Sequence, residues 1–328
     1  MQGLIIGFGQ DAKLLSIGLK KKGIDFKILV KPATIVTPFI SDFIDKGHLL
    51  YGDATDLSCL LKVCKKHQFT HIYNVAGNTL SQTSKMNFYQ YLNSNTQILT
   101  NILSVQENVG NLWIYHPLSS EILSGNRQET LIYPRNAYGV SKTTEYYISN
   151  IANSNGVSIF YPILFNHESC FRPKKFFSAK LIYFLKKNNQ RVLEIWNTNS
   201  CRDWGSASQY MNLILLASMK NKTGGGQLGT SKTQTIAEFV NSALRYLKIK
   251  YKAGQTKNRL RYWKLDDGRE IIEKERDVND ASRIVMADQR QVNKTFGKYK
   301  LIHGEELVHL LFKEYDLIQK NEYLKIVR

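Results

Sequence analysis

The stretch GLIIGFGQDA, residues 3–12, opens the chain with a short apolar run that leads directly into two glycines. Residues 3–6 are predicted to form a buried strand, and residues 11–22 a helix. The turn between them follows the pattern G-x-G-x-x-A, at Gly7, Gly9 and Ala12. Glycines at the first two positions permit a tight turn and a close approach to the backbone, while the N-terminus of the helix attracts a pyrophosphate. This order of strand, turn and helix predicts a dinucleotide-binding unit.

The first half of the chain continues to alternate strand-like and helix-like segments. Strands are predicted at residues 25–30, 49–51, 71–75, 112–115 and 157–165, and helices at residues 57–67, 89–108 and 137–152. Strands that alternate with helices in this way are typical of a parallel sheet covered by helices. The predicted fold class is therefore α/β, with a Rossmann-type doubly wound parallel sheet.

The pattern loosens in the second half, where residues 250–283 are charged and weakly periodic. Its other predicted features are helices at 176–187, 208–219 and 304–317, a turn or short linker at Gly224 to Gly226, and a strand at 227–229. We expect a dinucleotide-binding domain over residues 1–165, with later elements returning from about 191–245. Residues 166–190 and 246–328 are expected to form a smaller, interleaved C-terminal lobe that binds substrate.

Length and composition exclude several classes of protein. A chain of 328 residues with 43% hydrophobic residues forms a sizeable core, so it is not disordered, collagenous or a small disulfide-stapled protein. The cysteines are too few and too scattered for a disulfide framework, and they lack the close pairs of a zinc site: Cys59, Cys64, Cys170 and Cys201. We expect no metal. Without a signal peptide or an 18-residue apolar segment, the protein is expected to be soluble and cytoplasmic, with no membrane partner.

The chain is strongly basic, with 45 Lys and Arg against 27 Asp and Glu and a formal net charge of +18. Such a charge attracts polyanions of any kind. The lysine clusters are short, however, and apolar helical segments separate them, which argues against nucleic acid. A basic RNA-binding protein and a non-catalytic dinucleotide sensor stay open as alternatives from another class, although aromatic-basic repeats are lacking.

Tyr138 and Lys142 are four residues apart at the start of a predicted helix, which places both on one face. An ammonium beside a phenol favours the phenolate, and this is expected to lower the tyrosine pKa toward working pH. Ser119, Ser120 and Glu121 follow the strand predicted at 112–115, where this fold delivers a hydroxyl beside the tyrosine. Lys31 stands after the second strand, where an acid would bond an adenosine ribose, so NADP(H) is preferred to NAD.

Longer strings in the chain resemble one family. The turn at Gly7, Ser119 and the Tyr138 and Lys142 pair are similar to the extended short-chain dehydrogenase/reductases. Within that superfamily, four longer strings resemble segments of the GDP-mannose 4,6-dehydratases. They are YGDATD at 51–56, YPRNAYGVSK at 133–142, LFNHES at 164–169 and RDWG at 202–205. This resemblance implies loss of water from GDP-mannose, or from a close GDP-sugar such as a GDP-heptose, to give a 4-keto-6-deoxy product.

The resemblance also implies residue roles. Ser119 would orient the C4 oxygen, Tyr138 with Lys142 would take its proton, and Glu121 would act as both base and acid in the elimination. A GDP-4-keto-6-deoxyhexose reductase or epimerase of the same fold is the alternative, but it has no need of Glu121. The implied cofactor residues are Gly7, Gly9, Gln10, Asp11, Lys31, Asp53, Ala54, Ala76, Tyr138, Lys142, His167 and Arg172. The implied substrate residues are Ser120, Asn166, Lys180, Arg202 and Arg276.

Several features depart from the family pattern. The glycine turn is one residue tighter, and the stretch between Lys31 and Gly52 is short. Lys31 and Pro32 stand where the family has two arginines. The predicted helices at 89–108 and 137–152 occupy positions that pair into a four-helix bundle in this superfamily, so a homodimer is expected. A cofactor-bridged tetramer stays open. An aspartate such as Asp53 is also an ordinary helix N-cap.

Overall fold

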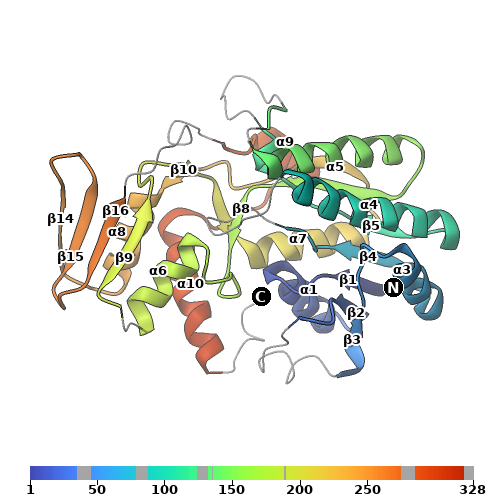
Figure 1. The fold of residues 1–328 in the computed structure, drawn as a ribbon, viewed down its shortest axis with the longest axis horizontal. Coiled ribbons are helices and arrows are strands. Elements are labelled where there is room, and N and C mark those ends of the chain that lie inside the picture. Colours follow the sequence, from blue (N-terminus) through green and yellow to red (C-terminus); the bar gives the residue numbers. More distant parts are fainter. Residues whose placement is uncertain are drawn as a thin grey trace.

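The computed structural model describes residues 1–34, 46–78, 88–123, 132–134, 136–187, 190–274 and 285–320. These residues form a large parallel sheet covered by helices and a smaller sheet at the far end of the molecule (Figure 1). The predicted α/β, Rossmann-type fold class is confirmed. Among the described residues, no helix combines the length and the apolar character needed to cross a membrane.

The large sheet has the strand order β12-β7-β5-β4-β1-β2-β3, with β6 also paired to β7, and all its pairs are parallel. Its strands are β1 (Gln2–Ile6), β2 (Asp25–Val30), β3 (Leu49–Tyr51), β4 (His71–Asn74), β5 (Trp113–Tyr115), β6 (Leu118–Ser119), β7 (Ile159–Leu164) and β12 (Gly224–Leu228). The chain reverses direction across the sheet between β1 and β4. In doubly wound sheets, ligands bind beyond the carboxyl ends of the strands at this point.

Helices cover both faces of the large sheet. On one face, α1 (Gln10–Lys21) packs against α7 (Ala207–Met219), and on the other α4 (Phe88–Val109) packs against α3 (Leu57–His67) and α5 (Ala137–Ser154) (Figure 1). Two short 3-10 helices, η1 (Lys46–His48) and η2 (Ser120–Ile122), lie in connections. The predicted helices of the first half therefore all occur, with ends shifted by one or two residues.

The prediction of a turn or linker at Gly224 to Gly226 is wrong, because these glycines belong to β12 and pair in parallel with β7. A Cβ at Gly226 would lie 2.2 Å from the Thr295 hydroxyl of α9 (Gln289–Phe296), and one at Gly225 would lie 3.1 Å from the Tyr161 ring. Close approach of neighbouring side chains thus accounts for Gly225 and Gly226, and Gly224 has a φ of +89°, which favours glycine.

The smaller sheet has the order β14-β15-β16-β9. Its elements are β9 (Val192–Trp196), β14 (Tyr251–Gln255), β15 (Arg261–Leu265) and β16 (Glu270–Lys274), packed with α6 (Phe177–Lys187), α8 (Ile236–Tyr246) and α10 (Gly304–Gln319). Trp263, Ile271 and Phe312 belong to a separate hydrophobic core here. The described part of the charged stretch, up to residue 274, therefore contains three strands, and in β15 the buried Trp263 alternates with the exposed Lys264.

Two strings singled out in the sequence pair with each other. β8 (Asn166–Glu168), from LFNHES, runs parallel to β11 (Trp204–Ser206), from RDWG, so that His167 lies opposite Gly205. The buried Asp203 carboxylate accepts N–H bonds from Thr230, Ser231 and Ala287. These bonds hold the segment after β12 and the segment before α9 against Asp203. Two very short strands, β10 (Cys201–Arg202) and β13 (Gln234–Thr235), pair nearby.

Candidate active site

A cleft lies where the carboxyl ends of β1, β2 and β4 meet the loops of the smaller lobe. It consists of two adjoining cavities of about 360 and 280 Å³, whose linings share Asp11, Ala76, Gly77 and Arg172. The larger cavity runs past the glycine turn to Lys31 and Asp53. The second runs to Glu121, Tyr138 and Lys142. Together they have the size of a site for a small-molecule ligand.

The glycine turn is shaped for close approach of a ligand to the backbone. Gly7 has a φ of +109°, and a Cβ there would lie 2.9 Å from the backbone nitrogen of Ala76. Gly9 is the N-cap of α1 with a φ of −77°, and its Cβ would meet no described atom within 4 Å. The protein's own packing therefore requires glycine at Gly7, whereas at Gly9 the open space faces the N-terminus of the helix. This cradle suits a phosphate group.

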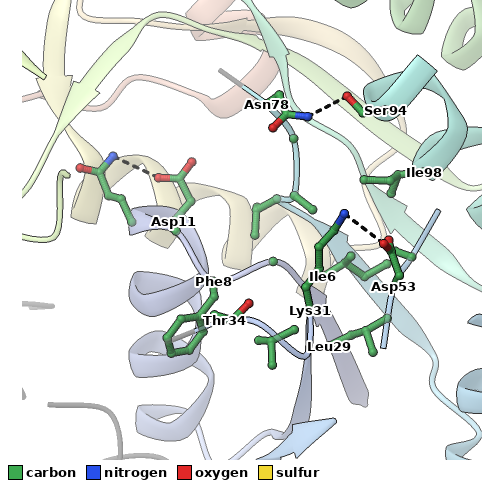
Figure 2. Close-up of a pocket in the computed structure, with 18 of the residues that line it drawn as sticks. Ile6, Phe8, Asp11, Leu29, Lys31, Thr34, Asp53, Asn78, Ser94 and Ile98 are labelled. Carbon is green, nitrogen blue, oxygen red and sulfur yellow. Dashed lines mark hydrogen bonds and ion pairs between the residues drawn. The ribbon is translucent and has the colours of Figure 1, made fainter. Parts of the chain in front are cut away.

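Lys31 and Asp53 form an ion pair at the far end of the larger cavity, with Lys31 Nζ 3.0 Å from Asp53 Oδ2 (Figure 2). Burial would raise the pKa of Asp53, but bonds from Thr55 and Lys31 lower it below its ordinary value. Asp53 is not the helix cap considered from the sequence, because Asp56 caps α3 by accepting from Ser58 and Cys59. Asp53 therefore stays available to the cavity.

Small residues and one polar pair complete the lining of the larger cavity, from Ala54 to its junction with the second cavity. Ala54 is buried, and its carbonyl accepts a hydrogen bond of 2.9 Å from Asn101. Ala76 lines both cavities. Asn78 donates to the Ser94 hydroxyl over 2.7 Å (Figure 2). Sequence reasoning missed Asn78 and Ser94, because neither belongs to a recognisable motif.

A network of polar side chains joins α1 to β8. His167 Nε2 lies 3.1 Å from the Asp11 carboxylate, and the Gln10 amide donates to the His167 carbonyl over 3.1 Å. Burial would lower the pKa of His167, but the Asp11 carboxylate outweighs it and the pKa is raised. Arg172 lines both cavities and stacks on Phe176 at 3.9 Å from the ring centroid. The predicted residues Gln10, Asp11, His167 and Arg172 thus meet at the junction of the cavities.

The residues with predicted catalytic roles converge on the second cavity, which Ser119, Glu121, Tyr138 and Lys142 line together, with the predicted substrate residue Ser120 beside them. The Ser119 hydroxyl accepts from the Glu121 N–H over 3.2 Å, and the Asn136 amide donates to Glu121 Oε2 over 3.1 Å. Tyr138 is in the first turn of α5. The next residue, Gly139, has no room for a Cβ, which would lie 2.8 Å from the Glu121 carbonyl. This close approach brings η2 against α5.

The expectation that the Tyr138 pKa is lowered is wrong for the protein alone. Burial raises the pKa of Tyr138 above its ordinary value, and neither the Lys142 ammonium nor a hydrogen bond with Ser119 fully offsets that effect. The phenol is therefore protonated at neutral pH.

Sequence reasoning also missed two groups behind Lys142. Lys142 Nζ donates to Glu145 Oε2 over 2.8 Å, and Glu145 contacts His116. Lys142 and Glu145 are the only charged residues of the 18 in α5, and both are buried. This isolated pair of charges, three residues apart, is the feature of the sequence from which a role for Glu145 could have been predicted.

The remaining predicted substrate residues are spread more widely. Asn166 lines the second cavity. Lys180 lies on α6 with its ammonium 3.3 Å from the Glu194 carbonyl, and Arg202 lies in β10 with Nη1 2.9 Å from the Cys201 carbonyl. Neither lines the two cavities, so their part in binding stays a prediction. Arg276 lies outside the described residues. Within the described ranges, no group of three or more His, Cys, Asp or Glu side chains is placed to hold a metal ion.

Comparisons with known proteins show the family of the chain. Residues 4–310 match the family model described as GDP-mannose 4,6 dehydratase. The GDP-mannose 4,6 dehydratase of Drosophila melanogaster is 28% identical over 269 residues, covering 74% of this chain and 67% of that protein. GDP-mannose 4,6-dehydratase sdnI of Sordaria araneosa is 26% identical over 255 residues, covering 74% of this chain. The match spans 47%, about half, of the Sordaria protein.

A solved structure shares the fold over the whole chain. The dTDP-glucose 4,6-dehydratase of Bacillus anthracis, in complex with NAD, superposes with a TM-score of 0.74 and covers 100% of both chains. Its sequence identity is 14%, so this likeness shows the fold alone.

Proposed function

This chain belongs to the GDP-mannose 4,6-dehydratase family, and on that premise we propose that it removes water from GDP-mannose, or from a close GDP-sugar such as a GDP-heptose, to give a 4-keto-6-deoxy sugar. The observation that carries the proposal is the convergence of Ser119, Glu121, Tyr138 and Lys142 on one cavity. An oxidation at C4 needs the tyrosine and lysine. Loss of water from C5 and C6 needs a further carboxylate, and Glu121 supplies it.

The residues divide the proton transfers between them. Ser119 orients the C4 oxygen, and Tyr138, once its own proton has been released, takes the proton of the C4 hydroxyl. The residues around the glycine turn would hold a nicotinamide dinucleotide, which would supply the hydride chemistry that links C4 to C6. Oxidation at C4 acidifies the C5 proton, which Glu121 removes and then delivers to the departing C6 hydroxyl as water leaves. The proton held at Tyr138 returns at C5, so the net change is the loss of one water.

The larger cavity supports a dinucleotide cofactor, and NADP(H) is the form proposed. The cradle at Gly7 and Gly9 receives the pyrophosphate at the N-terminus of α1. Lys31 is a cation at the carboxyl end of β2, where a 2′-phosphate would lie, and Asp53 is held beside it at 3.0 Å. Asp53 with Ala54 flanks the adenine, and His167 with Arg172 lies toward the second cavity.

The GDP-sugar extends from the second cavity toward the smaller lobe. Ser120 and Asn166 line this cavity, and an asparagine amide can donate to a phosphate oxygen. Lys180, Arg202 and Arg276 are proposed for the diphosphate and base on the family pattern. No nucleic-acid or membrane partner is proposed.

A homodimer through α4 and α5 is part of the proposal. These two helices pack side by side, and α4 with α5 exposes the large side chains of Tyr89, Tyr147 and Ile151. Light scattering at micromolar concentration should give twice the mass of one chain. A strictly monomeric species would contradict the dimer, and a fourfold mass would indicate the tetramer.

The test of the reaction is an incubation with GDP-mannose and NADP, followed by mass spectrometry. The expected product is lighter than the substrate by one water, with no net change in the cofactor. A reductase or epimerase of the same fold is the second candidate. It would leave GDP-mannose unchanged in mass and would act instead on the 4-keto-6-deoxy sugar.

A further inference from the structure

A series of buried polar side chains in mutual contact lies behind Lys142. Its ammonium donates to Glu145 Oε2 over 2.8 Å and to the Pro117 carbonyl over 3.1 Å. An ammonium has three donors, so the protein interior uses two and one is left for a group in the cavity that Lys142 lines. Glu145 is 0% exposed and Lys142 is 6% exposed. The position of the ammonium is thus fixed from within the fold.

The series of buried polar contacts continues from Glu145 to Asn74 of β4. His116 Nε2 contacts the same Glu145 oxygen, and the Asn74 amide nitrogen lies 2.9 Å from His116 Nδ1. Because the amide nitrogen is a donor, Nδ1 accepts and Nε2 carries the proton that points at Glu145. Burial lowers the pKa of His116, which favours the neutral ring. The Glu145 carboxylate therefore carries the one negative charge that balances Lys142 in this group.

We propose that Glu145 is a positioning residue for the reaction: its carboxylate holds the Lys142 ammonium beside Tyr138 and sets the pH at which the Tyr138 proton is released. This inference rests on the proposed function, because it concerns the step in which Tyr138 takes a proton. The two charges sit on one helix, one turn apart, and both are buried. An anion so placed cancels part of the field by which the ammonium favours a phenolate.

The groups that face Tyr138 determine the direction in which the Glu145 charge shifts the pH of Tyr138 ionisation. They are Lys142 and Glu145 from α5, Glu121 from η2 and the Ser119 hydroxyl at the end of β6, while His116 acts on Glu145. Lys142 favours the phenolate, whereas Glu145 and Glu121 oppose it. Glu145→Gln removes the negative charge but keeps an amide oxygen that can accept from the Lys142 ammonium, so the cation stays beside Tyr138. The Tyr138 and Lys142 pair should then lose its first proton at lower pH.

The test compares Glu145→Gln with the unmodified protein in two measurements. The first is the ionisation of Tyr138, taken as the tyrosinate absorbance of each protein minus that of its Tyr138→Phe version, without substrate. The second is the pH dependence of cofactor reduction in the first turnover with GDP-mannose. Both midpoints should move to lower pH by about one unit or more.

Matched variants separate this role from ordinary packing. Glu145→Asp keeps the charge, so its midpoints should return toward those of the unmodified protein even if its rate is lower. Glu314→Gln removes another buried carboxylate, on α10 outside the cleft, and should leave both midpoints unchanged. If Glu145→Gln does not fold, Glu145→Asp against Glu145→Ala makes the same comparison of charge.

The two proposals fail differently. A Glu145→Gln protein that is slower or less stable but has unmoved midpoints would overturn the positioning role. If the unmodified protein does not convert GDP-mannose to a product lighter by one water, the proposed function fails instead. The substrate-free titration still decides the role of Glu145 in that case.

Discussion

The two ends of the cleft are built differently. At the catalytic end, Lys142 and Glu145 lie inside the protein on one helix, with 6% and 0% of their surface exposed. At the other end, the side chains of Lys31 and Asp53 are 62% and 40% exposed, and each extends from a connection after a strand. Both ends hold a lysine paired with a carboxylate at 3.0 Å or less. They differ in solvent access and in the rigidity of the supporting element.

That difference determines what each pair can do. A buried pair is costly to break, because the partner left behind is an uncompensated charge. An exposed pair contributes at most about 1 kcal/mol and exchanges easily with a ligand. The catalytic end is therefore suited to holding one fixed geometry. The exposed end is suited to recognition, in which a charged group of the ligand replaces a contact with water.

The largest effect is expected at Tyr138. Tyr138→Phe removes the group that takes the C4 proton, so cofactor reduction and water loss should both fall by about two to four orders of magnitude. Tyr299→Phe is the matched control, because Tyr299 is exposed and does not line the cleft. Stopped-flow absorbance of the reduced cofactor provides the measurement. Comparable rates for the two variants would contradict the assignment.

A smaller but still large effect concerns stability. Lys142→Met leaves the buried Glu145 without its cation, and the free energy of unfolding in urea should fall by about 3–5 kcal/mol. Adding Glu145→Gln should recover a large part of that loss, because no buried charge then remains unpaired. Arg245→Met breaks the exposed pair with Glu305 and should cost less than about 1 kcal/mol. Equal losses for Lys142→Met and Arg245→Met would remove the distinction between the two kinds of pair.

The smallest effect is expected at the exposed end. NADP should bind several-fold tighter than NAD, and Lys31→Ala should erase that preference, because a charged contact contributes about 1 kcal/mol or more. The variant also leaves Asp53 without its cation, which adds repulsion toward a 2′-phosphate. Lys22→Ala, at the exposed end of α1, is the control. Equal affinities of the unmodified protein for the two cofactors would show that Lys31 does not select NADP over NAD.

The sequence predicted the parallel sheet well, because apolar strands and their glycine turn carry strong local signals. Gly7, Asp11, Glu121 and Tyr138 were all chosen from motifs, and the cleft brings them together. The strands at 251–274 were missed because they are short and about half of their side chains face water. Each strand then has too few apolar residues for the alternation to be recognised. Glu145 and His116 were missed for another reason. Their contact joins two elements far apart in the chain, and spacing does not reveal it.

The tyrosine pKa shows the same limit. The spacing of Tyr138 and Lys142 correctly predicts an ammonium that favours the phenolate. The net shift has the opposite sign because burial of the phenol is the larger effect, and burial depends on the whole fold. Sequence reasoning identified the interacting pair but not the balance between the two effects.

The central claim is that oxidation and elimination use different residues, and Glu121→Gln tests it most directly. This variant keeps the size of the side chain and its bond to Asn136, but it cannot accept the C5 proton. On mixing with GDP-mannose, it should still reduce the bound cofactor, visible as near-ultraviolet absorbance, while product formation falls by about two to four orders of magnitude. Normal turnover by Glu121→Gln would contradict the dehydratase assignment and favour the reductase or epimerase.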